Sequence, residues 1–431
     1  MKPVVLLATT RLWAPVARLA MTLANAGFNV EAVCPMGHPV TKTRAVSRTF
    51  AYRGLAPLQS FAEAFLASKP DLVIPGDDLA AEQLHGLYFR ERPKHDSAAK
   101  ALCSVIERSL GAPESYSVVH ERSTFIQVAA QEGVRVPRMA LIKNFTELRD
   151  LVPQFGFPMV LKANGTSGGE GVRVVRSLKE AGRALGALQA PPLLARALKR
   201  ALLDRNTTLL WPWLLRRRSL VNAQSFIAGK EATSLVACWR GRVLADLHFE
   251  VLKKNSSSGP ASVLRIIENA EMLNAAETMV RRLNLSGLHG FDFMLEAKTG
   301  DAYLIEINPR STQVGHLSLG SRRDLSAALF SSVTGHEPRE SPKVTEKDTI
   351  ALFPQEWLRD SKSEYLKSAY HDVPWEEPEL VNLCIKTSKK WASRKSHRDR
   401  IKAFWLLADA SFENSEAATL PEPVIAEPGR S

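Results

Sequence analysis

The stretch of sequence that most constrains the fold runs from Gly290 to Arg310 and reads GFDFMLEAKTGDAYLIEINPR. Its pattern predicts a β-hairpin. Residues 298–300 (Lys-Thr-Gly) predict a three-residue turn, because a glycine at the last position accepts the left-handed backbone conformation. That turn sets the register of the two strands and places Asp292 opposite Glu306.

The predicted register gives the hairpin two different faces, because side chains alternate along each strand. Phe293 then lies near Ile305, and Glu296 lies near Ala302. The apolar face would comprise Phe291, Phe293, Leu295, Tyr303, Ile305 and Ile307. The opposite face would gather Asp292, Glu306 and Asn308.

The two carboxylates on the polar face predict a cation site. Directly opposed side chains lie about 5 Å apart at Cβ, so Asp292 and Glu306 could share one cation that relieves their mutual repulsion. Oxygen ligands of this kind suit a Mg²⁺ ion that substrate phosphates also hold. The alternative is a solvent-facing strand pair with scattered acids.

The length of 431 residues indicates two or three domains, and the hydrophobic fraction of 45% is ordinary for a globular protein. A net charge of +12 indicates an anionic partner, which could be a nucleotide, a substrate, a membrane surface or a nucleic acid. The cysteines are isolated and predict neither a zinc site nor disulfides: Cys34, Cys103, Cys238 and Cys384. With neither a signal peptide nor an apolar run of about 20 residues, we expect a cytoplasmic protein.

The first 112 residues predict a Rossmann-like domain. Apolar strands at 3–9, 28–34 and 71–75 alternate with helices at 14–26 and 58–68, which is typical of a doubly wound sheet. A G-x-G-x-x-G fingerprint does not follow the first strand, so usual NAD binding is not expected. Of the two acids after the third predicted strand, either Asp77 or Asp78 could face a substrate or cap a helix.

A glycine-rich segment, NGTSGGEGV at 164–172, lies between a strand at 157–163 that carries Lys162 and a strand at 172–175. Glycines let backbone N–H groups approach phosphate oxygens closely, and a nearby lysine adds positive charge. An ordinary surface hairpin is the alternative.

Two further segments have a distinctive composition. Residues 191–218 combine basic side chains with Leu and Trp, which suits a membrane interface or an anionic partner, or else a docked helix with a solvated basic face. Residues 253–260 (KKNSSSGP) form a polar loop that could act as a lid over a site.

In this order, the motifs resemble those of the ATP-grasp superfamily, near its carbamoyl-phosphate-synthase-like, carboxylate–amine ligase branch. The resemblance is carried by FD at 291–292, EINPR at 306–310, KANGTSGGEGV at 162–172 and Q-x-F-I at 224–227. It implies a mixed α/β and α+β chain in which a Rossmann-like domain, 1–112, precedes a two-subdomain ATP-grasp fold. That fold would occupy 113–340 and include the basic insert 191–218. An accessory region, 341–412, and a disordered tail, 413–431, would follow.

The resemblance implies an ATP site built from matching positions. Lys162 would contact the α- and β-phosphates, and the glycine-rich loop would cover the β- and γ-phosphates. Gln224 stands where an acid usually binds the adenine amino group, and Glu231 matches the acid on the ribose. The remaining implied nucleotide contacts are Arg122, Ser167, Gly168, Gly169, Phe226 and Ile227.

The resemblance also implies the reaction. Asp292, Glu306 and Asn308 would hold Mg²⁺, or Mn²⁺ as the alternative, while Arg310 and Lys162 would act on the transferred phosphate. The implied enzyme is an ATP-dependent ligase that activates a carboxylate as an acylphosphate for attack by an amine. Alternatives are a phosphotransferase and a non-catalytic ATP-binding scaffold at a membrane or protein partner. No specific nucleic-acid partner is expected.

Overall fold

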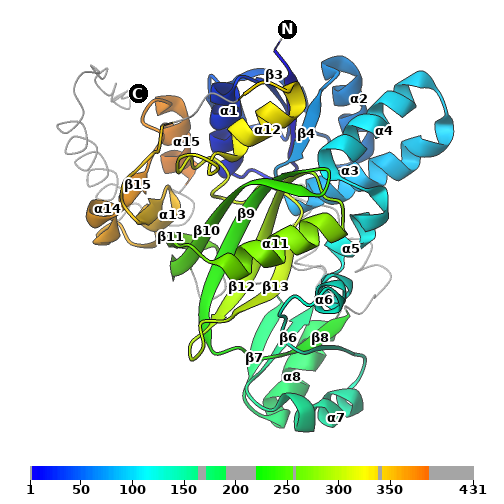
Figure 1. Cartoon of the computed structure of the whole chain (residues 1–431), viewed down its shortest axis with the longest axis vertical. Coiled ribbons are helices and arrows are strands. Elements are labelled where there is room, and N and C mark those ends of the chain that lie inside the picture. The colour runs from blue at the N-terminus through cyan, green and yellow to red at the C-terminus, as the bar shows by residue number, and fades with distance from the viewer. Residues whose placement is uncertain (1, 164–170, 191–219, 256–258, 338–341, 388–431) are drawn as a thin grey trace, which may run out of the picture.

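The computed structural model describes residues 2–163, 171–190, 220–255, 259–337 and 342–387, arranged around three β-sheets. A parallel sheet at the N-terminus, a seven-stranded sheet in the centre and a four-stranded sheet at the other end follow one another along the long axis (Figure 1). This mixed α/β architecture agrees with the predicted fold class. The predicted limits 1–112, 113–340 and 341–412 remain predictions.

The N-terminal sheet has the strand order β3-β2-β1-β4, and every neighbouring pair is parallel. Its strands are β1 (Val4–Ala8), β2 (Asn29–Cys34), β3 (Val46–Ala51) and β4 (Leu72–Pro75). Its helices are α1 (Pro15–Ala26), α2 (Pro57–Ser68), α3 (Asp78–Glu91) and α4 (Ser97–Leu110). Gly27 ends α1 with a φ of 118°, as expected of a left-handed cap. The prediction missed β3, an edge strand whose polar side chains are mostly exposed.

The central sheet has the order β13-β12-β9-β10-β11-β14-β15. Its strands are β9 (Gly229–Trp239), β10 (Arg242–Lys254), β11 (Ala261–Ile266), β12 (Gly287–Glu296), β13 (Ala302–Asn308), β14 (Thr349–Leu352) and β15 (Tyr370–Asp372). One face packs against α11 (Ala270–Arg282) and α6 (Arg122–Gln131). The other face shares a core with α12 (Leu325–Thr334) and with α1, so the N-terminal domain and this sheet are packed as one body.

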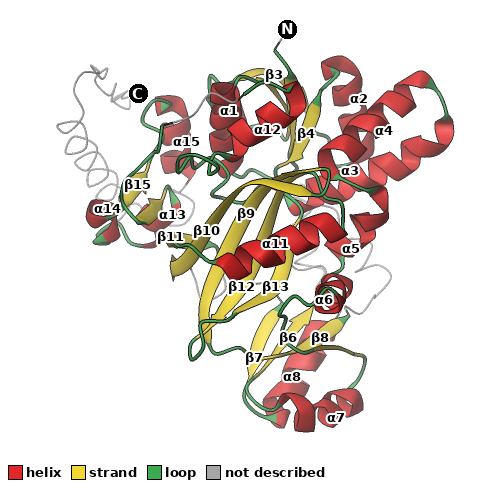
Figure 2. Ribbon diagram, viewed as in Figure 1, coloured by secondary structure: helices red, strands yellow, loops and turns green. Residues whose placement is uncertain are grey.

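The third sheet has the order β5-β8-β6-β7 and is flanked by α7 (Phe145–Phe155) and α8 (Leu178–Gln189) (Figure 2). Its strands are β5 (Met139–Ile142), β6 (Met159–Ala163), β7 (Val172–Val175) and β8 (Val221–Ser225). The predicted hairpin of β6 and β7 is confirmed. The neighbouring strands β8 and β9 do not form a hairpin, because β8 pairs with β5 and β6 while β9 joins the central sheet.

The β12–β13 turn is one residue longer than predicted. The backbone N–H of Glu296 donates to the oxygen of Asp301 at 2.9 Å, which leaves a four-residue loop at 297–300. Gly300 has the expected positive φ, 79°. The extra residue shifts the pairing of the strand segments next to the loop.

A β-bulge at Ile305 reverses this shift. Phe293 pairs with Leu304, not with Ile305 as predicted, yet Asp292 pairs with Glu306 as expected. Two core residues were therefore predicted wrongly, Tyr303 and Ile305, and the buried residues in their place are Ala302 and Leu304. The bulge thus leaves the predicted pair of acids intact.

The described C-terminal residues complete the central sheet and contact the N-terminal domain. The helices here are α13 (Gln355–Arg359), α14 (Tyr365–Ser368) and α15 (Pro378–Thr387). Arg18 of α1 forms an ion pair of 2.6 Å with the buried Asp372 of β15. The predicted disordered tail, 413–431, and the basic insert, 191–218, lie outside the described residues.

Candidate functional site

The β12–β13 hairpin brings the predicted acids together. Asp292 Oδ1 accepts a hydrogen bond from Thr233 Oγ1 at 2.9 Å, and its Oδ2 accepts one from Asn308 Nδ2 at 3.0 Å. Burial, and then the negative charge of Glu306, raise the pKa of Asp292 to about 6. The positive charge around the buried Asp292 therefore does not offset its burial and the repulsion from Glu306.

A cation reaches this pair from the start of α6. Arg122 Nη2 lies 2.8 Å from Glu306 Oε2, and the arginine side chain is only 13% exposed. The helix places Arg122 here because its preceding segment, α5 (Tyr116–His120), packs against α6. The arginine predicted to contact a nucleotide thus pairs with one of the predicted metal ligands in this structure.

Lys162 of β6 approaches the same acids from the small sheet. Its side chain is buried, and burial, followed by the positive charge of Arg122, lowers its pKa to about 8. The charges of Glu306, Asp292 and Glu231 act in the opposite direction. Three acids of the central sheet and one arginine of α6 thus act electrostatically on an ammonium group of the small sheet, which locates the site where the small sheet meets the hairpin (Figure 1).

Arg310 connects the hairpin to the N-terminal domain. Its Nε donates to Asp78 Oδ1 at 2.7 Å, its Nη2 donates to Asn308 Oδ1 at 3.3 Å, and its guanidinium lies 5.2 Å from the ring centroid of Trp13. Of the two acids weighed from the sequence, Asp77 caps α3 by accepting from the backbone of Ala80. Asp78 faces Arg310 instead, at the edge of the predicted site.

The residues predicted around adenine and ribose follow the crossing from β8 to β9. Gln224 is buried within β8, whereas Phe226 is 39% exposed just beyond the strand. Glu231 forms an ion pair with Lys254, with 2.6 Å between Oε1 and Nζ, and the sequence did not predict this contact. Its only signal was the lysine pair at the start of the segment predicted as a lid, 253–260. Ile227 lies in the same crossing, while Ser167, Gly168 and Gly169 lie outside the described residues.

The donor atoms at the hairpin fit a magnesium ion held largely by substrate. The described residues contain no group of three His, Cys, Asp or Glu side chains that could hold a metal. Asp292, Glu306 and the amide of Asn308 provide oxygen donors, and Mg²⁺ commonly combines one or two carboxylates with phosphate and water ligands. The raised pKa of Asp292 marks a place where a cation would lower the free energy of the ionised pair.

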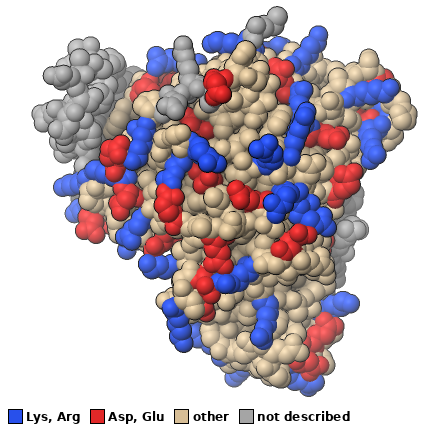
Figure 3. Space-filling model, viewed as in Figure 1, with Lys and Arg blue, Asp and Glu red and all other residues tan. Residues whose placement is uncertain are grey.

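Among the described helices, none has the length and apolar character needed to span a bilayer. On the face shown in Figure 3, basic and acidic side chains are interspersed over the described surface. The net positive charge is thus not gathered into one patch on that face.

A family model for the ATP-binding domain of the carbamoyl-phosphate synthase large chain matches residues 121–318. The carbamoyl phosphate synthase large chain of Deinococcus deserti is 22% identical over 56% of this chain and 22% of its own length. The N-terminal section of the Aquifex aeolicus large chain is 25% identical over 50% of this chain and 34% of its own length. The chain thus spans about a third or less of the length of these relatives.

Solved structures share the fold at low sequence identity. N5-carboxyaminoimidazole ribonucleotide synthetase in complex with ADP is 15% identical, with a TM-score of 0.54 over 79% of this chain and 80% of that one. The biotin carboxylase domain of Hydrogenobacter thermophilus 2-oxoglutarate carboxylase is 14% identical, with a TM-score of 0.54 over 78% and 71%. An L-amino acid ligase from Bacillus licheniformis is 16% identical, with a TM-score of 0.52 over 79% and 76%. The match over residues 121–318 and this shared fold agree with the resemblance to the ATP-grasp superfamily.

Proposed function

We propose that the protein is an ATP- and Mg²⁺-dependent ligase that activates a carboxylate for attack by an amine. The observation that carries this proposal is the convergence of Asp292, Glu306 and Asn308 with three cations, Lys162, Arg122 and Arg310. Two acids with an amide suit a metal-bound triphosphate, and the cations suit its phosphates. The similar carboxylases and ligases support the same reaction class.

Each group of residues has a distinct role in this proposal. Gln224, Phe226 and Ile227 would bind the adenine edge, and Glu231 would bind the ribose hydroxyls. Lys162, Ser167, Gly168 and Gly169 would hold the phosphates. Asp292, Glu306 and Asn308 would hold Mg²⁺, with Mn²⁺ as an alternative ion, and the bound ion would neutralise charge on the triphosphate.

The proposed reaction has two steps. A carboxylate oxygen of the substrate attacks the γ-phosphorus of ATP, the bond to the β–γ bridging oxygen breaks, and ADP leaves. The amine nitrogen then attacks the carbonyl carbon of the acylphosphate, phosphate leaves, and the nitrogen releases a proton to solvent. Lys162 and Arg310 would stabilise the negative charge that develops on the transferred group.

Arg310 also indicates where the carboxylate would bind. Its guanidinium bridges Asn308 of the proposed metal site and Asp78 at the edge of the N-terminal sheet. In open α/β sheets, ligands bind outside the carboxyl ends of the strands, and β4 ends just before Asp78. The acceptor carboxylate would therefore lie between this edge and the triphosphate.

The location and partners complete the proposal. A cytoplasmic location would supply ATP and keep the four free cysteines reduced. The expected membrane or protein contact through 191–218 falls on residues outside the described structure and stays a prediction.

Trapping with hydroxylamine tests the reaction without knowledge of the natural amine. The protein is incubated with ATP, Mg²⁺, hydroxylamine and a panel of carboxylic acids, and hydroxamate, ADP and phosphate are measured. A ligase gives hydroxamate in equal amount to ADP with at least one acid, and Glu306→Gln gives none. Stable phosphorylated product without hydroxamate would indicate a phosphotransferase, and ATP binding without turnover across the panel would indicate a scaffold.

A further inference from the structure

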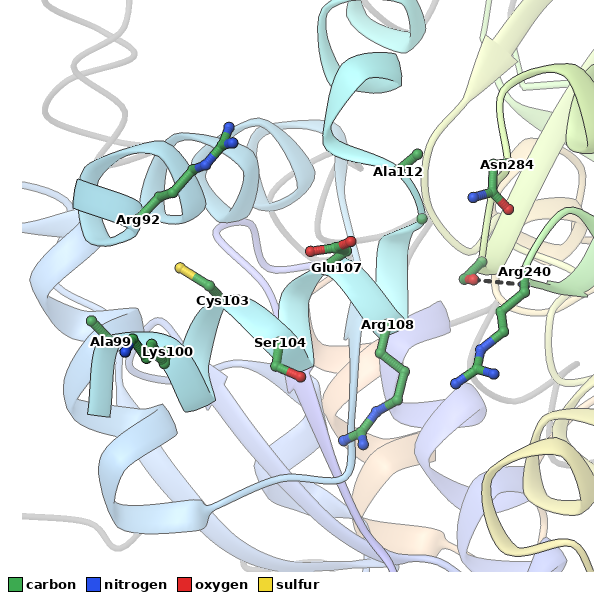
Figure 4. Close-up of a pocket in the computed structure, with 12 residues that line it drawn as sticks. Arg92, Ala99, Lys100, Cys103, Ser104, Glu107, Arg108, Ala112, Arg240 and Asn284 are labelled. Atoms are coloured by element: carbon green, nitrogen blue, oxygen red, sulfur yellow. Dashed lines mark hydrogen bonds between the residues drawn. The ribbon is translucent and has the colours of Figure 1, made fainter. Parts of the chain in front are cut away.

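A cavity of about 630 Å³ lies away from the acids of the hairpin. It is formed between α4 and the two tight connections at the far end of the central sheet, around Arg240 and Asn284 (Figure 4). Cys238, at this end of β9, lies five positions along the strand from Thr233, which is beside Asp292. At the rise of an extended strand this is roughly 17 Å.

The lining of this cavity is strongly basic. It contains four basic side chains, Arg92, Lys100, Arg108 and Arg240, and a single carboxylate, Glu107. Within the described parts of the chain, none of the four cations forms an ion pair. With one carboxylate against four cations, the cavity carries an excess of positive charge.

Two of these cations, Arg108 and Arg240, come from different parts of the fold, and their side chains extend toward the same side of the cavity. Arg108 lies near the end of α4, and Arg240 lies in the turn between β9 and β10 (Figure 4). Arg108 Nη2 donates to the backbone oxygen of Asp71, while its buried Nε has no hydrogen-bond partner in the described structure. Ser104 and Lys100 line the same side of α4.

The backbone around Arg240 is specialised for this position. Arg240 and Gly241 form a two-residue turn in which both have positive φ, 48° and 76°. Asn usually occupies the first position of such a turn, because a longer side chain is strained there. Hydrogen bonds hold the turn in place, since Arg240 N donates to Ser286 Oγ and Gly241 N donates to the oxygen of Leu285. The turn thus holds Arg240 at the cavity in a backbone conformation that few non-glycine residues adopt.

We propose that this cavity binds a small phosphate-bearing metabolite at the junction of the N-terminal domain and the ATP-grasp domain. Arginine suits phosphate because its fork of N–H groups binds two oxygens at once. Ser104 and Ser286 add hydroxyl groups, and the volume matches that of pockets for small organic ligands. A ligand held by both Arg108 and Arg240 would stabilise the contact between the two domains.

Calorimetry on the full chain in phosphate-free buffer tests this site with ribose 5-phosphate, inorganic phosphate and ribose. We expect ribose 5-phosphate to bind, ribose not to bind, and Arg240→Asn to weaken binding at least tenfold. Asn is chosen because it tolerates the left-handed backbone. Equal binding of inorganic phosphate would support the site and show that the free ion suffices.

Matched variants separate this site from the proposed active site. Arg242→Gln removes a neighbouring exposed arginine outside the cavity, and Asp292→Asn alters the hairpin, so both should bind ribose 5-phosphate as the wild type does. Arg108→Gln should weaken binding as Arg240→Asn does. The proposal is overturned if neither phosphate nor ribose 5-phosphate binds, or if Arg240→Asn binds with unchanged affinity.

Discussion

Arg310 Nε and Asp78 Oδ1 lie 2.7 Å apart, joining the end of β13 to the first turn of α3 across 232 residues of sequence. The same guanidinium reaches Asn308 at 3.3 Å and lies over Trp13. One side chain therefore fixes the proposed metal site relative to the edge of the N-terminal sheet.

Replacing Asp78 with asparagine should lower turnover about tenfold while sparing ATP affinity, because the orientation of Arg310 is lost and the adenine contacts are untouched. Steady-state kinetics with the acid identified by hydroxamate trapping would measure this. Asp96→Asn is the matched control, since Asp96 caps α4 away from the site and Asn is also a good cap. Unchanged turnover in Asp78→Asn would remove the ion pair from the mechanism.

Glu306→Gln should lower ATP turnover by at least about a hundredfold without unfolding the protein, because the amide keeps the shape of the side chain and removes its charge. Turnover is followed by ADP release, and the fold by circular dichroism. Glu296→Gln on the same hairpin is the control, since Glu296 is half-buried at the far end of the hairpin, where its carboxylate accepts a hydrogen bond from the turn residue Thr299. Near-normal turnover in Glu306→Gln would contradict the metal assignment.

Asp292 should make the free protein less stable as pH rises. Its pKa in the folded state, about 6, lies above the ordinary value of 3.8. A carboxyl group with a raised folded pKa contributes its full stability below the unfolded pKa, and that contribution is lost as pH rises through 6. Asp292→Asn should therefore raise the melting temperature at pH 8 and change it little at pH 4.

The same titration should control metal binding. Calorimetry with Mg²⁺ and ATP should show affinity increasing from pH 5 to pH 7 in the wild type, as Asp292 loses its proton. The increase should be smaller in Asp292→Asn, where only the deprotonation of ATP itself remains. The stability prediction has its own contrary outcome. If Asp292→Asn melts below the wild type at pH 8, the buried carboxylate stabilises the free protein.

The sequence predicted the acid pair because the hairpin pattern is local. A glycine-containing turn and alternating side chains are encoded within 21 residues, and Asp292 does face Glu306. The loop length was wrong by one residue, and the bulge at Ile305 compensated for it. A bulge leaves no clear signal in a single sequence, because its φ and ψ angles suit ordinary residues.

Contacts between distant segments could not be predicted in the same way. The pairing of Arg310 with Asp78 and that of Glu306 with Arg122 depend on how two domains and two sheets pack. The sequence indicated that these residues are charged and lie next to predicted elements, but not which opposite charge each would meet. The exposed edge strand β3 was missed for a related reason, since its polar side chains lack the apolar pattern of a buried strand.

ATP affinity should fall in mild alkali, because Lys162 then loses its positive charge. Burial and the charge of Arg122 lower its pKa to about 8, so the free protein loses this positive charge well below the ordinary lysine value of 10.5. ATP affinity, measured by calorimetry with Mg²⁺, should fall between pH 7.5 and pH 9 in the wild type. Lys162→Met should bind ATP weakly with no such pH dependence, whereas Lys162→Arg should restore part of the affinity and remain charged throughout. The same alkaline loss of affinity in Lys162→Met would assign the titration to another group and remove Lys162 from the phosphate site.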